Sequence, residues 1–207
     1  MIVISHRGYW KSAEEKNTAI AFHRSFDLGF GTETDIRDLN QLLVISHDMP
    51  DQSAMLFSQL LEILGERNLP LALNVKADGL SDALTSALLN HTNKNWFVFD
   101  MAIPDMRAYL NAGIPVFARL SEVEPSPVWF DQVTGIWLDS FEEEWYDANM
   151  IQSLLKQDKK VCIVSSELHG RKYDSLWSML KPISHYSNLM ICTDLPEQAQ
   201  QYFGVSK

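Results

Sequence analysis

The chain opens with Met1-Ile2-Val3-Ile4-Ser5-His6-Arg7-Gly8, in which a short apolar run gives way to charged residues. An uninterrupted apolar run of this length is typical of a strand that is buried on both faces of a parallel sheet. Counting Ile2–Ser5 as the first, seven more runs of the same kind follow along the chain. They are Phe30–Ile36, Leu71–Lys76, Trp96–Asp100, Pro115–Leu120, Gly135–Asp139, Lys160–Ser165 and Leu189–Thr193. We therefore expect eight parallel strands.

Helical patterns fill most of the gaps between these runs. The expected helices are Thr18–Leu28, Ser58–Leu64, Ser81–Asn90, Pro104–Asn111, Glu142–Lys156 and Tyr173–Leu180. Glycines such as Gly29 and Gly65 directly follow two of them, as is common at helix C-termini. Ser121–Thr134, which contains two prolines, has the weakest helical pattern. Leu42–His47 is a further strand-like run, and it follows the second strand so closely that a hairpin turning at Asp38-Leu39-Asn40 is expected.

Strands that alternate with helices predict an α/β fold, a compact (β/α)8 TIM barrel with a β-hairpin extension after the second strand. An open doubly wound sheet is the alternative. The length of 207 residues is near the lower limit for such a barrel, so its loops must be short and its mouth open. We expect residues 1–207 to form a single domain.

The composition excludes several classes of protein. With 46% hydrophobic and 21% charged residues, the chain is neither disordered nor a disulfide scaffold. Its formal net charge of −10 argues against a nucleic-acid or anionic-membrane binder. Two cysteines, Cys162 and Cys192, favour a reducing compartment. Because no signal peptide or transmembrane segment is recognisable, we expect a cytoplasmic protein. The sequence leaves the oligomeric state open.

Polar residues stand where the first three strands end. In a barrel of this kind, the C-terminal ends of the strands line the active site. The first strand ends in Ser5-His6-Arg7-Gly8, the second in Glu33-Thr34-Asp35 and the third in Asn74-Val75-Lys76, while the hairpin returns His47-Asp48. We therefore expect these side chains to surround one opening.

Glu33 and Asp35 are two residues apart on one strand, so their side chains share a face. Two carboxylates held together repel unless a cation lies between them or one is protonated. Because only oxygen ligands are available, Mg²⁺ or Ca²⁺ is the expected cation.

His6 and His47 are candidates for an acid–base pair, because imidazole titrates near neutral pH. The alternative is that each only caps its strand. Arg7 offers a planar fork that suits phosphate, and Lys76 adds a second positive charge. A divalent metal together with these residues matches phosphoryl chemistry.

Further polar residues fall at or just beyond the later strand ends: Asp100, Arg119, Asp139, Glu167 and Asp194. Arg119 and Glu167 are taken as candidate substrate contacts. Loop structure explains the segments 119–122 and 165–171 equally well.

These residues also carry a resemblance to a known family. His6-Arg7-Gly8, Glu15-Lys16-Asn17-Thr18, Glu33-Thr34-Asp35 and His47-Asp48 resemble the H-R-G, E-N-T, E-x-D and H-D signature of the glycerophosphodiester phosphodiesterases, which are TIM barrels. Thr193-Asp194-Leu195-Pro196 is similar to the T-D-x-P that closes the family pattern.

The resemblance implies a function and roles for single residues. It makes His6 and His47 the catalytic acid–base histidines, Arg7 a phosphate contact, and Glu33 and Asp35 metal ligands. The implied reaction is metal-dependent hydrolysis of a phosphodiester of the glycerophosphodiester type, which releases an alcohol and a phosphomonoester. The implied partner is thus a small-molecule phosphodiester substrate.

This sequence also departs from the family pattern. The third strand of the family usually carries Glu-x-Lys, whereas Asn74 stands here, which could ligate the metal through its carbonyl oxygen with one negative charge fewer. Lys16 replaces a usual Glu, the hairpin turn is one residue shorter, and the segment Met49–Pro70 is short. The alternative is therefore a catalytically weak or inactive TIM barrel that binds a phosphorylated ligand. A metal-independent sugar or phosphosugar isomerase on the same fold is disfavoured by the E-x-D.

Overall fold

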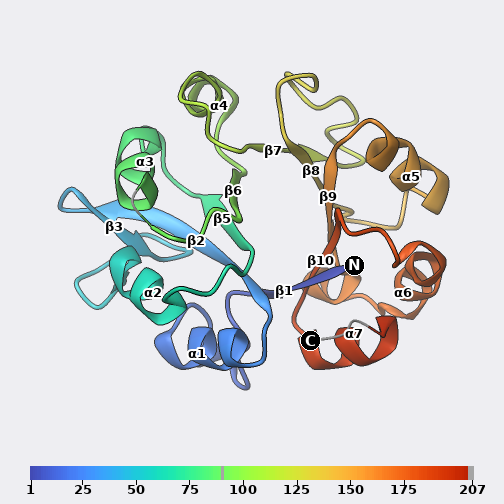
Figure 1. Cartoon of the computed structure of the whole chain (residues 1–207), viewed down its shortest axis with the longest axis horizontal. Helices are drawn as coiled ribbons and strands as arrows, with labels where there is room; N and C mark the ends of the chain where they lie inside the picture. Colours follow the sequence, from blue (N-terminus) through green and yellow to red (C-terminus); the bar gives the residue numbers. More distant parts are fainter. Residues whose placement is uncertain (90, 205–207) are drawn as a thin grey trace.

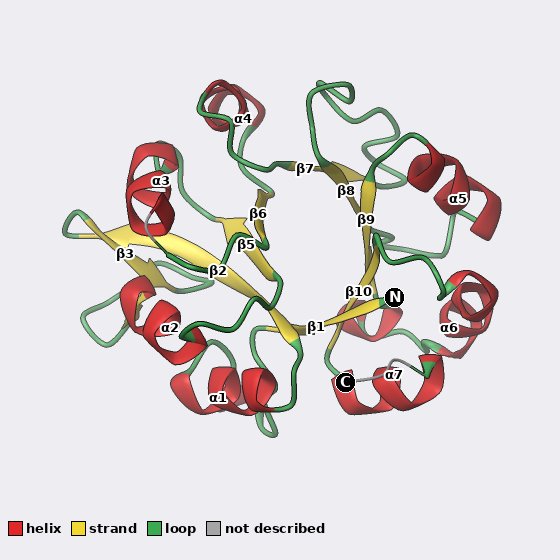
Figure 2. Ribbon diagram, viewed as in Figure 1, coloured by secondary structure: helices red, strands yellow, loops and turns green. Residues whose placement is uncertain are grey.

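Eight parallel strands surround the centre of the molecule and helices pack around the outside of them in the computed structural model, which describes residues 1–89 and 91–204 (Figures 1 and 2). The strands are β1 (Ile2–His6), β2 (Gly31–Leu39), β5 (Leu71–Val75), β6 (Trp96–Phe99), β7 (Phe117–Leu120), β8 (Gly135–Leu138), β9 (Lys160–Val164) and β10 (Leu189–Thr193). All eight coincide with predicted runs. The predicted α/β fold is confirmed.

Backbone pairing runs almost completely around this set of strands. Parallel ladders join β1 to β2, β2 to β5, β5 to β6, β7 to β8, β8 to β9, β9 to β10 and β10 back to β1. The first strand thus lies beside the last, as in a barrel. Between β6 and β7 the recorded contact is one isolated bridge, Val98 to Val116, with Val98 N donating to the Pro115 carbonyl at 2.9 Å.

Seven α-helices occur within the described residues: α1 (Ala19–Asp27), α2 (Phe57–Leu64), α3 (Ser81–Leu89), α4 (Ile103–Asn111), α5 (Ala148–Lys156), α6 (Asp174–Leu180) and α7 (Pro196–Phe203). Short 3₁₀ turns form at η1 (Ala13–Glu15), η2 (Ser166–His169) and η3 (Lys181–Ile183). Of the predicted helix Ser81–Asn90, the last residue lies outside the described residues. None of these helices has the length and apolar character that crossing a membrane requires.

The helices differ from the sequence-based expectation in three places. The helix expected from Glu142 begins at Ala148, because the Asp147 side chain accepts a hydrogen bond from Met150 N at 2.8 Å and caps it there. The segment 121–134 forms turns, bends and an isolated bridge between Ser121 and Glu124 instead of a helix. A helix that was not predicted, α7, follows the last strand, and only Pro196, Ala199 and Phe203 of its eight residues are buried.

The predicted hairpin is present, with a different turn. β2 continues to Leu39, which pairs with Leu42 at the start of β3 (Leu42–Ile45). The turn is therefore Asn40-Gln41, and both residues have positive φ, 51° and 66°. A two-residue turn of this kind matches the twist of the strands it joins. A two-residue strand, β4 (Met55–Leu56), pairs with β3 on its outer side.

Two hydrophobic cores lie on the two sides of the strands. Alternate residues of a strand point to opposite faces, so Val3 packs in the large core beneath the helices and Ile4 packs in a smaller cluster inside the ring. The inner cluster contains stacked aromatic pairs. The Phe97 and Phe117 rings, one on β6 and one on β7, have centroids 3.6 Å apart. Stacked side chains thus connect β6 to β7, the two strands whose backbones are joined by a single bridge.

Candidate active site

A pocket of about 270 Å³ lies over the inner cluster, at the C-terminal ends of the strands. It is lined by His6, Arg7, Lys16, Glu33, Asn74, Phe99, Asp100, Trp137, Asp139, Val164, Leu168 and His169. We call it the strand-end pocket. It brings together predicted residues from β1, β2 and β5 and adds residues that follow β6, β8 and β9.

His6 is held between two carboxylates. Its Nδ1 lies 2.8 Å from Asp194 Oδ1, just past β10, and its Nε2 lies 3.9 Å from Glu33 Oε2. β1 runs between β2 and β10, so both partners come from neighbouring strands. With Nδ1 bonded to Asp194, the Nε2 of His6 is the nitrogen turned toward Glu33 and the pocket.

Glu33 is almost completely buried. Burial raises the pKa of its carboxyl well above the usual value, and the nearby Asp35 carboxylate raises it further. The Arg7 backbone N–H donates to the Glu33 carbonyl at 3.0 Å and to Oε2 at 3.2 Å. Such a carboxyl either holds a proton or needs a cation beside it.

Asp35 lies among positively charged and amide groups. Arg7 Nε is 3.0 Å from Oδ2 and Lys76 Nζ is 3.5 Å from Oδ1. The Asn17 amide also donates to Oδ2 at 2.9 Å. The two residues predicted as phosphate contacts, Arg7 and Lys76, therefore converge on this buried carboxylate.

A tight turn places the Arg7 side chain. Arg7 and Gly8 both have positive φ, 57° and 80°. A Cβ at Gly8 would lie 2.7 Å from the Ala21 Cβ on α1, so glycine is required for both its φ and its close approach. The Gly8 N–H donates to Thr32 Oγ1 at 2.9 Å, which ties the turn to β2.

Asn74 pairs with Asp35 in the ladder between β2 and β5. Its Nδ2 donates to Asp100 Oδ2 at 3.2 Å. The remaining oxygens, Asn74 Oδ1, Asp35 Oδ1 and Asp100 Oδ1, are buried and make no hydrogen bond. Lys76 and Arg119 lie within ion-pair distance of Asp35 Oδ1 and Asp100 Oδ1, whereas the Asn74 amide oxygen has no recorded donor, which is uncommon for a buried oxygen and fits a hard cation.

The donor set at this place is mixed. Within the described part of the chain, no group of three or more histidine, cysteine, aspartate or glutamate residues is arranged to hold a metal ion. A site built on Glu33 and Asp35 therefore depends on the amide oxygen of Asn74 as well. The predicted ligand set carries one negative charge fewer than three carboxylates would, and its role in binding a metal stays a prediction.

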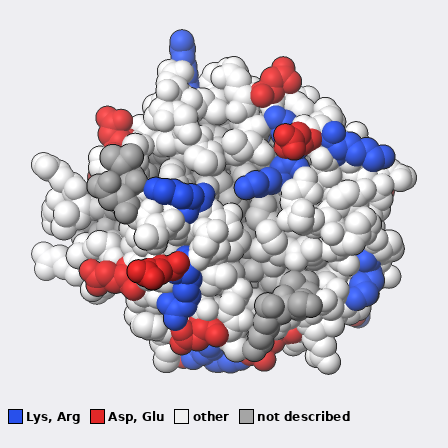
Figure 3. Space-filling view, viewed as in Figure 1, with Lys and Arg blue, Asp and Glu red and all other residues white. Residues whose placement is uncertain are grey.

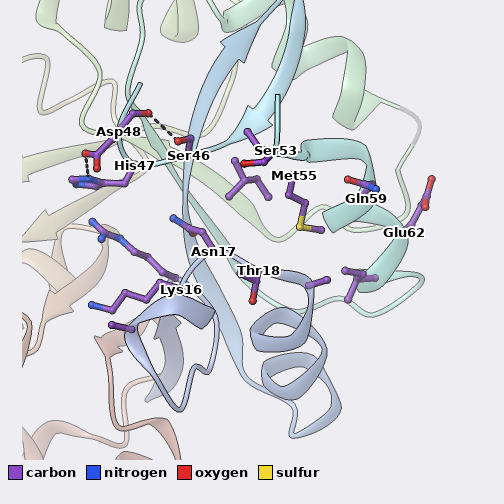
Figure 4. Close-up of a pocket in the computed structure, with 16 residues that line it drawn as sticks. Lys16, Asn17, Thr18, Ser46, His47, Asp48, Ser53, Met55, Gln59 and Glu62 are labelled. Carbon is purple, nitrogen blue, oxygen red and sulfur yellow. Dashed lines mark hydrogen bonds and ion pairs between the residues drawn. The ribbon is translucent and has the colours of Figure 1, made fainter. Parts of the chain in front are cut away.

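His47 lies in a second pocket of about 850 Å³ beside the first, which we call the hairpin pocket. Arg7 and Lys16 line both pockets, and in Figure 4 His47 and Lys16 extend to the same side. His47 Nδ1 is 2.8 Å from Asp48 Oδ1, and both side chains are exposed. The structure therefore places His47 at the rim and His6 in the strand-end pocket.

Arg119 and Glu167, the other candidate substrate contacts, are engaged by neighbouring residues. Arg119 Nη1 is 3.4 Å from Asp100 Oδ1, and its Nε pairs with Glu124. The Glu167 carboxylate accepts hydrogen bonds from the Ser165 and Thr193 hydroxyls and from Asp194 N at 3.1 Å. Neither residue is among those lining the strand-end pocket, and their contact with substrate stays a prediction.

Sequence reasoning missed two contributors to the site. Asn17, which belongs to the E-N-T segment, links β2 to the loop before α1 by bonding Asp35 and accepting from Thr34 Oγ1 at 2.8 Å. Its place in the motif was the available signal. His169 lines the strand-end pocket. It belongs to the segment 165–171, for which the sequence left substrate contact and loop structure open, without a role for this histidine.

Comparison with known proteins supports the fold. No protein-family model and no curated protein sequence matches the chain. Several solved structures do match. A glycerophosphodiester phosphodiesterase from Parabacteroides distasonis has 17% identity and a TM-score of 0.70, with 98% of this chain and 96% of that chain covered. An Oleispira antarctica phosphodiesterase, solved in complex with the product sn-glycerol-3-phosphate, has 16% identity and a TM-score of 0.74, with 99% and 97% covered.

A third similar structure is the glycerophosphodiester phosphodiesterase from Agrobacterium tumefaciens, with 14% identity and a TM-score of 0.70, and 99% of this chain and all 100% of that chain covered. At such identities the likeness concerns the fold. The chain therefore has the fold of the glycerophosphodiester phosphodiesterases, the family that its motifs resemble.

Proposed function

We propose that this protein hydrolyses a phosphodiester of the glycerophosphodiester type in the strand-end pocket. The observation that carries the proposal is the position of His6, bonded to Asp194 on one nitrogen and facing the buried Glu33 with the other. Arg7 lies beside it, and the H-R-G, E-x-D and H-D segments agree with a fold that the chain shares with phosphodiesterases.

His6 would act as a general base. Asp194 holds its Nδ1 and stabilises the imidazolium that forms when Nε2 takes a proton. The attacking oxygen, from water or from a hydroxyl of the substrate, would lose its proton to that Nε2. Arg7 and Lys76 would offer the positive charge that phosphate oxygens need.

Glu33, Asp35 and Asn74 would hold a divalent cation, Mg²⁺ or Ca²⁺. When bound, such an ion stabilises negative charge on phosphate oxygens as a Lewis acid. The buried amide oxygen of Asn74, which accepts no hydrogen bond, supports this assignment. The raised pKa of Glu33 agrees with it, because a neighbouring cation would stabilise the ionised form of a carboxyl that burial disfavours.

A phosphodiester carries two ester groups, and each of them needs its own binding pocket. The hairpin pocket adjoins the strand-end pocket through Arg7 and Lys16, so it would take one of them. The resemblance assigns the second proton-transfer role to His47, which lines the hairpin pocket. The Oleispira antarctica enzyme contains glycerol phosphate as product, and a glycerol phosphate half is accordingly our first choice for the strand-end pocket here.

The second candidate function is binding of a phosphorylated ligand without turnover. The observation that favours it is Asn74, whose amide removes a charge from the cation site. Nucleic acid is not an expected ligand in either case, because the formal net charge is −10, and acidic side chains lie among the basic ones on the face seen in Figure 3. The cytoplasmic location stays a prediction.

A panel of phosphodiesters tests the proposal. Glycerophosphodiesters, nucleotide-linked glycerols and an aryl diester would be incubated with Mg²⁺, Ca²⁺ or Mn²⁺, and with chelator. We expect turnover of at least one diester that depends on metal and is abolished in Glu33→Gln, with His23→Gln on the exposed face of α1 as the control. Full turnover in excess chelator would refute the metal role. Binding of glycerol 3-phosphate without any turnover would favour the second candidate.

A further inference from the structure

A second histidine–aspartate pair, in which the aspartate is buried, lines the strand-end pocket. His169 Nε2 lies 2.7 Å from Asp139 Oδ1. Asp139 directly follows β8 and His169 belongs to η2, which follows β9. Both residues line the pocket that also contains His6 and Glu33. Neither residue has a role in the proposed function described above.

One backbone donor and one side-chain donor fix Asp139 in place. The Ser140 N–H donates to Asp139 Oδ1 at 2.8 Å, and the Trp145 indole donates to the Asp139 carbonyl at 2.9 Å. Asp139 is thereby kept pointing at His169 without help from a ligand.

The loops after β8 and β9 are also tied to each other. Arg171 donates to the Ser140 carbonyl at 2.6 Å and to Glu144 Oε1 at 2.7 Å. Ser166 Oγ donates to the same Glu144 oxygen at 2.7 Å. Phe141 packs edge-on against the His169 ring, with centroids 5.4 Å apart. This network holds an imidazole and its carboxylate in a defined orientation, as acid–base catalysis requires.

Three histidine–aspartate pairs surround the mouth of the ring, and their exposure differs. The side chains of His6 and Asp194 are 15% and 17% exposed, and those of His169 and Asp139 are 25% and 9% exposed. The side chains of His47 and Asp48 are 47% and 93% exposed. Solvent screens the His47 pair most, so its carboxylate supports an imidazolium least.

We propose that His169 is the second acid–base group of this site and protonates the leaving alkoxide; this proposal rests on the proposed function. With Nε2 bonded to Asp139, Nδ1 is the nitrogen that can donate to substrate. His47 then contacts the ester group in the hairpin pocket.

The proposed step consumes one diester and one water molecule. The water oxygen forms a bond to phosphorus while His6 Nε2 takes its proton. The bond from phosphorus to the leaving oxygen breaks, and that oxygen takes the proton of His169 Nδ1. The products are a phosphomonoester and an alcohol, and the two histidines return to their starting states by exchanging one proton with solvent.

The role of His169 can be tested by comparing substrates whose leaving groups differ in their need for a proton. Glycerophosphoethanolamine releases an alkoxide that needs a proton, whereas glycerol 3-phosphate p-nitrophenyl ester releases a phenolate that does not. We expect His169→Gln to lower kcat/KM for the first substrate by about 10²–10⁴ and for the second by less than ~10-fold. Asp139→Asn should show the same selective loss, to a smaller extent. His23→Gln is the matched control.

Two results would overturn the assignment of His169. A loss confined to the alkyl diester in His47→Gln, with His169→Gln close to wild type, overturns the proposal. Equal losses on both substrates in a folded His169→Gln protein, judged by its melting temperature, do so as well. If His169→Gln does not fold, Asp139→Asn decides by the same comparison. Absence of turnover of both diesters in the wild type would instead refute the proposed function itself.

Discussion

The Asn74 amide uses one of its two ends: Nδ2 donates a hydrogen bond to Asp100, and Oδ1 is buried without a hydrogen bond. Replacing it by glutamate would add a third carboxylate beside Glu33 and Asp35. Because ligand charge increases the affinity of an oxygen site for divalent cations, we expect Asn74→Glu to reach half-maximal activation at a lower Mg²⁺ or Ca²⁺ concentration. Isothermal titration with metal measures the same shift independently of turnover.

The matched variant is Asn74→Leu, which removes the oxygen without adding charge. It should require more metal than the wild type. In chelator, Asn74→Glu should melt at a lower temperature than the wild type, because the new carboxylate has no cation to balance it. An unchanged metal titration in both variants would show that residue 74 does not touch the ion.

Single elements show where local sequence decides structure. The Asn40-Gln41 turn holds Gln41 at φ 66°, a left-handed conformation in which glycine is relaxed and other residues are strained. Gln41 is exposed. We therefore expect Gln41→Gly to stabilise the protein by about 0.5 kcal/mol. Urea unfolding would measure this change, and Gln41→Val should be destabilising. A lower stability in Gln41→Gly than in Gln41→Val would contradict the assignment of this turn.

The strands could be predicted because each is an apolar run that the ring buries on both faces. The hairpin was predicted too. Its turn was expected at residues 38–40 instead of Asn40-Gln41, because the pairing of Leu39 with Leu42 depends on the register between the two strands. α7 could not be predicted from periodicity, since three buried positions leave little pattern. At the site, the motifs indicated His6, Arg7 and Glu33. The contact between His169 and Asp139 depends on how the loops after β8 and β9 pack against each other, which cannot be predicted from a single sequence.

At the scale of the whole molecule, four buried acids make the fold sensitive to alkali. Burial raises the pKa of the Cys162 and Cys192 thiols well above the usual value, and it also raises the pKa of the Tyr109 and Tyr146 hydroxyls. A group whose pKa is raised by folding contributes stability below its unfolded pKa and loses it as the pH rises toward the folded value. For the thiols this loss begins near the ordinary value of 9.0.

We therefore expect the free energy of unfolding to fall as the pH rises above about 9. Urea unfolding at a series of pH values from neutral to alkaline measures it. The Cys162→Ala, Cys192→Ala double variant should lose less stability over the same range. Both thiols should react with a disulfide reagent in urea and be protected in the folded protein, since both are free and buried. Rapid reaction without denaturant would contradict their burial.

The single bridge between Val98 and Val116 also makes the chain divisible. Ala112 and Gly113 lie exposed just before this junction, so a protein made as two pieces, 1–112 and 113–207, would interrupt the fewest backbone contacts between strands. The first piece would contain His6, Arg7, Glu33 and Asn74, and the second would contain Asp139 and His169. Co-expressed, the pieces should associate through the β1–β10 ladder and the stacked Phe97 and Phe117 rings. Either piece alone should be inactive, so turnover would report their assembly.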